Sequence, residues 1–216
     1  KKTLFLLLLI IFPTKTFALI KVDITRGNLN PLPIAVSPLS IDENSRKSFE
    51  KVLKKKNIGS DISTVVEKNL KTSGLFNPLN KDAFLQAPDI ANLKPRFEDW
   101  NLIKAQALIT GKVNFVDDKL RVEFRLWDVL AGKEMMALAF TTVPQNWRRV
   151  GHIITDKVYE RLTGEKGYFD TRIIYVAEEG PKTRRVKKLA IMDQDGANNK
   201  FLTLGNELVL TPRFNP

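Results

Sequence analysis

The feature that most constrains the fold is a run of three amphipathic segments separated by two tight turns. Residues 106–116, 120–129 and 134–143 are predicted strands, and the turns between them contain "DDK" and "LAGK". Turns this short join antiparallel neighbours. In the middle segment, apolar residues such as Val122 and Phe124 alternate with charged ones, which is typical of a sheet with one covered face. The chain is therefore expected to contain an antiparallel sheet that packs against helices.

Helices are predicted on both sides of these three strands. The first follows a cap at Ser60 or Asp61 and ends before Gly74, and the second covers residues 146–162. Their apolar stripes are Ile62, Val65, Val66, Asn69 and Leu70 in the first helix, and Val150, Ile154, Val158 and Leu162 in the second.

Shorter elements complete the first part of the chain. Residues 33–38 predict a short buried strand, and residues 42–56 and 97–104 predict two further helices. We expect residues 32–167 to form an α/β N-terminal domain, with a mixed sheet and packed helices.

The character of the chain changes near residue 171. From there to residue 216, four short apolar segments are divided by Gly, Asp and Asn turns. This length matches one four-stranded propeller blade of about 40–45 residues. Because a lone blade lacks neighbours on both faces, we expect residues 168–216 to be the first blade of a truncated β-propeller.

The N-terminus predicts export. Two lysines precede an apolar run over residues 4–12, and Thr16-Phe17-Ala18 supplies a cleavage site. These are the parts of a secretory signal peptide, residues 1–18. The apolar run is shorter than the roughly 20 residues that a membrane-spanning helix needs. We therefore expect cleavage after Ala18, a periplasmic location, and no transmembrane segment in the mature chain.

The mature chain would open with a tethered strand. Ile20, Val22 and Ile24 alternate with polar residues, and a linker rich in Gly, Asn and Pro follows over residues 27–33. The segment either joins the domain sheet as an edge strand or is held out for a partner. The residues alone leave both interpretations open.

The formal net charge of +11 includes two basic clusters. Lys51, Lys54, Lys55 and Lys56 form one, and Arg184, Arg185, Lys187 and Lys188 form the other. They could bind an anionic polymer or surface, or they could be a solvated helix face and strand edge. No aromatic residue is interleaved with them as a base-stacking platform requires, so no nucleic-acid partner is expected.

Motifs for catalysis or cofactor binding are absent from the sequence, so we expect neither an enzyme nor a cofactor. The sole histidine, His152, lies one helical turn before Asp156, close enough to hydrogen-bond it. We expect this pair to tie the helix to the adjoining domain. Asp193, Asp195 and Asn198 lack the full spacing of a calcium loop, so they predict a hairpin turn and no metal site. The three tryptophans are expected in the core or at a domain interface.

Four stretches resemble the TolB family, the periplasmic component of the Tol–Pal envelope system of Gram-negative bacteria. They are "NLKTSGLFNPL" (residues 69–79), "PRFEDWNLIKAQALITGKV" (95–113), "GHIITDKVYERLTGEKGYFDTRIIYVAEE" (151–179) and "AIMDQDG" (190–196). The likeness covers nearly all of the mature chain, except that residues 49–57 are longer and more basic than is usual in the family.

The resemblance implies a non-enzymatic adaptor. In this family the mature N-terminus recruits TolA of the inner membrane, and the propeller binds the outer-membrane lipoprotein Pal and other outer-membrane proteins. The linkage serves outer-membrane integrity, protein import and constriction at cell division. Carried over, the TolA-binding residues are Leu19, Ile20, Lys21, Val22, Asp23, Ile24, Thr25, Arg26 and Gly27. The alternatives are the N-terminal part of a propeller-bearing hydrolase or peptidase, and a binder of anionic polymers.

Overall fold

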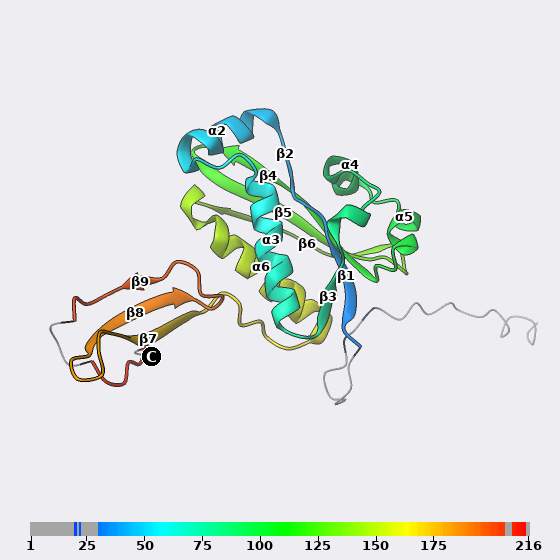
Figure 1. Ribbon diagram of the computed structural model, residues 1–216. Helices are drawn as coiled ribbons and strands as arrows, with labels where there is room; N and C mark the ends of the chain where they lie inside the picture. Colours follow the sequence, from blue (N-terminus) through cyan, green and yellow to red (C-terminus); the bar gives the residue numbers. More distant parts are fainter. Residues whose placement is uncertain (1–19, 21, 23–29, 206–208, 215–216) are drawn as a thin grey trace, which may run out of the picture.

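A six-stranded mixed sheet forms the centre of the larger part of the molecule (Figure 1). The computed structural model describes residues 20, 22, 30–205 and 209–214. The strands are β1 (Leu32–Val36), β2 (Ser40–Ile41), β3 (Phe76–Pro78), β4 (Ala107–Val116), β5 (Lys119–Asp128) and β6 (Lys133–Thr142). Their order is β3-β1-β4-β5-β6, and β2 also pairs with β4.

The predicted antiparallel meander is confirmed as β4, β5 and β6. Asp117 and Asp118 both have positive φ in the first turn, as a two-residue hairpin turn with the right twist requires. On the covered face Val122 lies opposite Val113 and Phe140. The predicted strand near residue 33 is β1, which pairs in parallel with β3 and β4.

Helices lie on both faces of this sheet, and successive residues of the central strands β1 and β4 point to two different cores. On β5, by contrast, the second face carries Lys119, Arg121, Glu123 and Arg125, none of which is buried. On one face lie α2 (Glu43–Leu53), α3 (Ile58–Thr72) and α6 (Trp147–Thr163), over a core that includes Ile34 and Ile109. On the other face, Ala35 and Leu108 pack against Trp100 of α5 (Phe97–Leu102). The remaining short helices are α4 (Pro88–Leu93), η1 (Lys81–Ala83) and η2 (Pro144–Asn146). This arrangement confirms the expected α/β domain.

The predicted start of α3 is wrong by three residues. The helix begins at Ile58 after Asn57, whose side chain makes no capping bond. Ser60 and Asp61 therefore lie in the first turn, where the Asp61 carboxylate is favourable near the positive helix end and pairs with Lys55 at 2.8 Å. The predicted end is confirmed, since Gly74 adopts φ +73° just beyond the helix. Strand β2 and helix α4 were not predicted.

The second part of the chain is an antiparallel sheet of β7 (Arg172–Glu179), β8 (Val186–Asp193) and β9 (Lys200–Phe201). Figure 1 shows this sheet to one side of α3 and α6, and the turn after β8 contacts Asn69 of α3 and Arg148 of α6. The fourth expected strand is not formed by residues 209–214, and residues 206–208 lie outside the described part. Among the described residues after 171, Ala190 alone is buried. The sheet thus offers two largely uncovered faces.

The predicted signal peptide, residues 1–18, lies outside the described residues. Within the part of the chain that the structure describes, no helix has the length and apolar character needed to cross a membrane.

The tryptophans lie where the sequence predicts. Trp100 is buried, and Trp127 packs edge-on to Phe97 while its indole N–H donates to Thr110 at 2.9 Å. Trp147 lies at the start of α6 with the Lys55 ammonium 4.7 Å from its ring centroid.

Candidate functional site

Two places on helix α6 are candidates for function: its C-terminal end, where the N-terminal segment contacts the domain, and its face toward the blade. Of the nine residues predicted to bind TolA, the structure describes Ile20 and Val22. Leu19, Lys21 and residues 23–27 lie outside the described part.

Both described residues of this segment are half-buried against the larger core. The Val22 N–H donates to the Leu162 carbonyl at 2.8 Å. Leu162 lies in the last turn of α6, whose carbonyls lack a partner within the helix. The Ile20 N–H donates to the Asp128 carboxylate at 3.3 Å, and the same buried carboxylate accepts from the Ala131 N–H at 2.8 Å. The segment thus supplies donors to acceptors that the domain leaves open.

The face of α6 toward the blade carries the junction between the two parts of the molecule. His152 is buried, and its Nδ1 lies 2.9 Å from the Asn69 amide nitrogen on α3. Asn69 also donates to Thr155 at 3.2 Å, and its carbonyl oxygen accepts from Gln194 of the blade at 3.0 Å. A chain of polar side chains therefore runs from the blade through α3 to α6.

Asp156 holds the connection between the two parts. Its two carboxylate oxygens accept from the backbone N–H groups of Phe169, at 2.6 Å, and Asp170, at 3.1 Å. A Cβ at Gly167 would lie 2.4 Å from the Asp156 Cα, so only glycine fits where the connection crosses the helix. The expected hydrogen bond between His152 and Asp156 is therefore wrong, because His152 contacts Asn69 while Asp156 accepts from Phe169 and Asp170. Both nevertheless lie at the junction.

Two arginines in the first turns of α6 form ion pairs at the same junction. Arg149 donates from Nε and Nη2 to the two carboxylate oxygens of Asp170, each at 3.1 Å, and these hydrogen bonds raise the pKa of Arg149. The Arg148 guanidinium binds the Asp195 carboxylate and lies 3.7 Å from Asp193. Burial by itself would raise the pKa of Asp195, but the Ala197 N–H and Arg148 outweigh it and lower that pKa.

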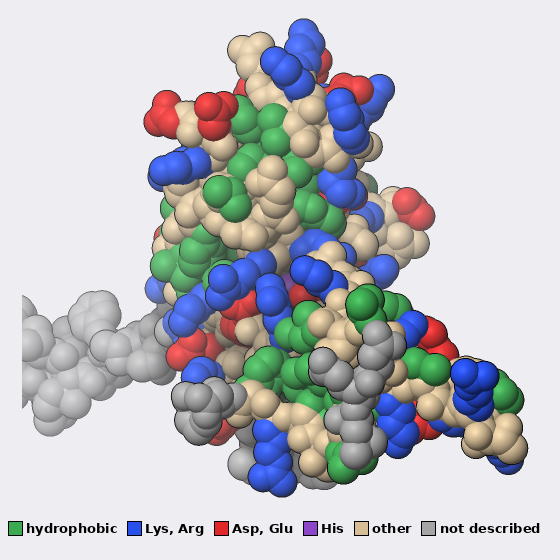
Figure 2. All heavy atoms as spheres, turned by 90° about the vertical axis from the view of Figure 1, so that its left-hand side faces the viewer, with side chains coloured by type: hydrophobic (Ala, Val, Ile, Leu, Met, Phe, Trp, Pro, Cys, Tyr) green, Lys and Arg blue, Asp and Glu red, His purple; other side chains and the backbone are tan. Residues whose placement is uncertain are grey.

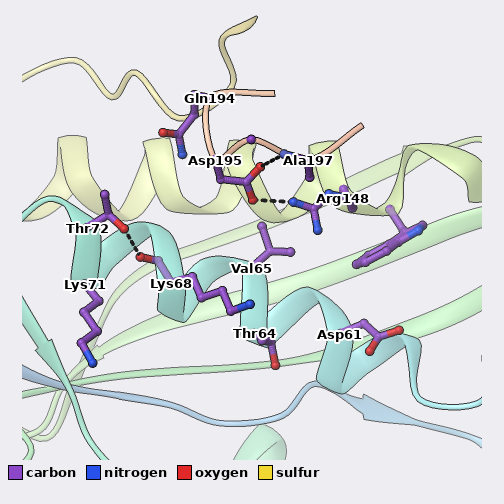
Figure 3. A pocket seen from close by; sticks show the side chains of 12 residues that line it. Asp61, Thr64, Val65, Lys68, Lys71, Thr72, Arg148, Gln194, Asp195 and Ala197 are labelled. Atoms are coloured by element: carbon purple, nitrogen blue, oxygen red, sulfur yellow. Dashed lines mark hydrogen bonds and ion pairs between the residues drawn. The ribbon is translucent and has the colours of Figure 1, made fainter. Parts of the chain in front are cut away.

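A groove of about 840 Å³ opens beside these ion pairs, between α3 and the blade turn at residues 194–197 (Figure 3). Lys68 and Lys71 of α3 line it together with Trp147 and Arg148. Viewed from the side of the blade, Lys and Arg side chains gather along the boundary between the two parts (Figure 2). The groove is open and mixed in charge, since Asp61 and Asp195 also line it.

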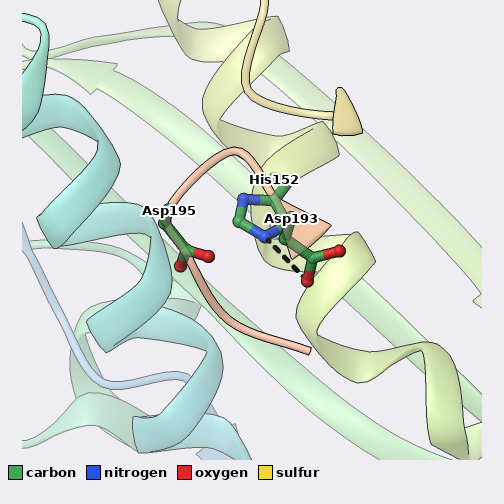
Figure 4. Close-up of side chains that lie close together, drawn as sticks. All are labelled: His152, Asp193 and Asp195. Atoms are coloured by element: carbon green, nitrogen blue, oxygen red, sulfur yellow. Dashed lines mark ion pairs between the residues drawn. The ribbon is translucent and has the colours of Figure 1, made fainter. Parts of the chain in front are cut away.

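The blade turn has the predicted hairpin geometry. Gly196 adopts φ +82° and Asn198 φ +54°. The Asn198 amide nitrogen donates to Asp193 at 2.6 Å, so this amide presents a donor and not a calcium ligand to that carboxylate. Asp193 and Asp195 instead face His152 (Figure 4).

Sequence reasoning missed Asn69, Gln194 and Arg148 as junction residues. The available indication was Asn69, which is polar within an otherwise apolar helical stripe. The first basic cluster lies at the end of a helix, as expected, whereas the second precedes and enters β8, which is the central strand of its sheet and not the expected edge strand. Lys55 and Lys56 pair with Asp61 and Glu50 around the end of α2, and strand residues such as Lys188 pair across β7 and β8.

Comparison with known proteins gives concordant matches over both parts. Residues 20–135 match the TolB amino-terminal domain, and residues 159–216 match the TolB beta propeller domain. The Tol-Pal system protein TolB of Pelagibacter ubique (strain HTCC1062) is 82% identical over 210 residues, which is 97% of this chain and 47% of that protein. The chain thus spans about half the length of this curated relative.

The fold is also similar to a solved structure. The crystal structure of TolB from Acinetobacter baumannii matches with a TM-score of 0.66 at 24% identity, over 85% of this chain and 41% of that one. This likeness supports the fold of an α/β domain followed by propeller strands.

Proposed function

The chain belongs to the TolB family, and from that premise we propose that it is a non-enzymatic periplasmic adaptor of the Tol–Pal system. In this proposal residues 19–27 bind TolA and the propeller binds Pal, so that the protein links the inner membrane to the outer membrane. The link would serve envelope integrity and constriction at division. The match to a curated TolB over 97% of the chain favours this role over a hydrolase.

The observation that carries the proposal is the docking of Ile20 and Val22 on the domain. Their backbone N–H groups are engaged by Asp128 and Leu162, and their side chains are half-buried. If TolA adds a strand along the edge that carries these two N–H groups, the segment has to leave Asp128 and Leu162. Docking and partner binding then compete for the same donors, as a two-state tether requires.

The strength of the docking suits a reversible tether. Full burial of an apolar side chain of this size contributes about 1.5–3 kcal/mol, and here both side chains are only half-buried. A hydrogen bond contributes about 1 kcal/mol net. The described contacts are thus worth a few kcal/mol before the entropy of ordering the segment, which opposes them at about 1–2 kcal/mol per residue.

Helix α6 offers a physical route by which the propeller could bias the tether. Its last turn accepts from Val22, and its earlier turns carry His152, Arg148 and Asp156, which contact the blade and the connection to it. We infer that Pal binding shifts the docking equilibrium through this helix. Such coupling has to act equally in both directions.

Deletion of residues 19–27 tests the proposal. The deleted protein should lose binding to TolA in calorimetry while the far-UV circular dichroism of the domain stays unchanged. Val22→Pro should also weaken binding severely, since it removes a backbone donor. The matched control, Lys21→Ala, should have a small effect because the sequence alternation places it opposite the apolar residues. Unchanged TolA binding by the deleted protein would show that the segment is not the TolA site.

A further inference from the structure

Three potential metal ligands from two parts of the molecule meet at the junction (Figure 4). They are His152 of α6, Asp193 at the end of β8 and Asp195 in the following turn, and their nearest ligand atoms all lie within 4.8 Å of one another. The closest approach to the ring is 3.9 Å, between His152 Nε2 and an Asp193 oxygen. The carboxylates belong to the blade, whereas the imidazole belongs to the α/β domain.

The His152 ring nitrogen that faces this cluster is without a hydrogen-bond partner in the described structure. The side chain is only 3% exposed, so bulk water does not satisfy it. Buried polar atoms almost always have a partner, and an exception calls for an explanation such as an ion. The unpartnered atom is therefore a second observation, independent of the acidic pair, that points to a ligand.

The other ring nitrogen faces an amide that can orient the ring as in metal-binding histidines once that amide has turned. A ligating imidazole typically donates its second N–H to a neighbouring group, which fixes the ring orientation. Asn69 occupies that place at 2.9 Å from Nδ1. The Gln194–Asn69–His152 chain can run in the other direction if each amide makes half a turn, which exchanges its oxygen and nitrogen. The Thr155 hydroxyl, which accepts from Asn69 and donates to the Gly151 carbonyl, then has to donate to the Asn69 oxygen instead. When the Asn69 oxygen faces Nδ1, the proton is on Nδ1 and the Nε2 lone pair faces the carboxylates.

We propose that His152, Asp193 and Asp195 bind a divalent transition-metal ion of the Zn²⁺ class across this junction. One imidazole and two carboxylates suit Zn²⁺, whose three-ligand sites are completed by water. The carboxylates are oriented by their own partners, since Asp193 accepts from Asn198 at 2.6 Å and Asp195 accepts from the Ala197 N–H at 3.2 Å. Calcium is a poorer fit because it prefers oxygen ligands throughout.

Arg148 is the competitor for this site. Its guanidinium binds Asp195 and lies near Asp193, so it neutralises part of the charge that the ion would neutralise. It has a place to move, because it borders the open groove and lies 5.6 Å from the Trp147 ring centroid. Zn²⁺ bonds of about 2.0–2.2 Å would also draw the blade turn toward α6. Metal binding would thus replace the Arg148 ion pairs between the two parts with metal coordination.

The composition of the chain makes the test unusually direct. His152 is the single histidine and there is no cysteine, so in a tag-free protein this ring is the one nitrogen or sulfur ligand typical of zinc. Calorimetric titration with ZnCl₂ should give one saturable site, and the ring nitrogen signals in ¹H–¹⁵N NMR should shift. His152→Gln should weaken Zn²⁺ binding by about tenfold or more, at least the scale known for groups that merely orient a ligand.

Arg148→Gln separates a metal site from a purely structural ion pair. If the site binds metal, this variant should bind Zn²⁺ more tightly, because the competing cation is gone. Asp195→Asn, in the exposed turn, should also weaken Zn²⁺ binding, and it provides the test if His152→Gln does not fold. The matched control is Asp82→Asn, at an exposed carboxylate outside the site, which should bind Zn²⁺ as the parent protein does. The proposal is overturned if Zn²⁺ leaves the ring signals unchanged, or if His152→Gln or Asp195→Asn binds it with unchanged affinity.

Discussion

The α/β domain and the blade are both sheets, but they differ in how their faces are covered. In the domain, helices pack on both sides, and strand residues such as Ile34, Val122 and Phe124 are at most 1% exposed. In the blade, Ala190 is the only buried residue among those described after residue 171. The difference shows that strands with alternating apolar and polar residues suffice to form a sheet, whereas the stability of that sheet comes from a second layer of structure packed against it.

The largest effect of this difference is expected in the amide hydrogen-exchange rates of the two sheets. Amides of β4 and β5 should exchange only through global unfolding, which for a domain of this kind costs about 5–15 kcal/mol. Amides of β7 and β8 should exchange many orders of magnitude faster, because their sheet opens without disturbing the domain core. Mass-spectrometric exchange on the present chain measures both at once. Equal protection of the two sheets would refute the comparison.

A pair of phenylalanine truncations sharpens the comparison at single residues. Phe124 is 1% exposed and stacks on Phe140, so Phe124→Ala should lower the free energy of unfolding by about 3–5 kcal/mol. The matched control is Phe201 in β9, which is 46% exposed. Phe201→Ala should change the free energy of unfolding by about 0.5 kcal/mol. Urea titration followed by tryptophan fluorescence reports the domain, because Trp100, Trp127 and Trp147 all lie in it. Similar midpoints for the two variants would contradict the expectation.

Within the domain, the sequence predicted the long strands better than the short elements for a physical reason. The strands β4 to β6 are joined by turns of a few residues, so their pairing is local and their alternation records the covered face. Strand β2 has two residues and α4 has six, which is too short for any periodicity to be visible. The start of α3 was missed because Asn57 caps it without a side-chain bond, while Ser60 and Asp61, which are equally common capping residues, follow in the first turn.

The junction was predictable only in part. The sequence placed His152 and Asp156 there, because a lone histidine with a nearby carboxylate on a helix is conspicuous. It could not show that Asp156 accepts from Phe169 and Asp170, since these bonds go to backbone groups that carry no sequence pattern. Nor could it bring Asp193 and Asp195 to His152, which requires the path of the chain between two sheets.

Asp156 gives the next smaller test, at the boundary between the two regions. Asp156→Ala leaves the N–H groups of Phe169 and Asp170 without acceptors, and an unsatisfied buried donor costs about 1–3 kcal/mol. The cost should appear locally, as faster exchange of those two amides and faster cleavage between residues 164 and 171 by added protease. The neighbouring control, Lys157→Ala, removes only an exposed pair with Glu160 and should leave both rates unchanged. Unchanged cleavage of the Asp156→Ala protein would mean that the connection is held by other contacts.

The smallest expected effect compares two helix starts within the domain. Helix α2 is capped by Asp42, whose carboxylate accepts from the Ser45 hydroxyl at 2.6 Å and the Ser45 N–H at 2.9 Å, whereas α3 has no such cap. Asp42→Ala should therefore lower the free energy of unfolding by about 1 kcal/mol.

The same cap makes a prediction about pH. The hydrogen bonds from Ser45 lower the pKa of Asp42 below its ordinary value. Because the unfolded chain then binds the proton at higher pH than the folded one, the stabilisation is complete above the ordinary aspartate pKa, about 3.9, and is lost as pH falls through the lowered value. Asp42→Asn keeps a capping oxygen but cannot titrate, so its stability should fall less steeply than that of the parent protein below about pH 4. Thermal melts across that range measure the slope, and parallel curves would show that Asp42 does not contribute to acid sensitivity.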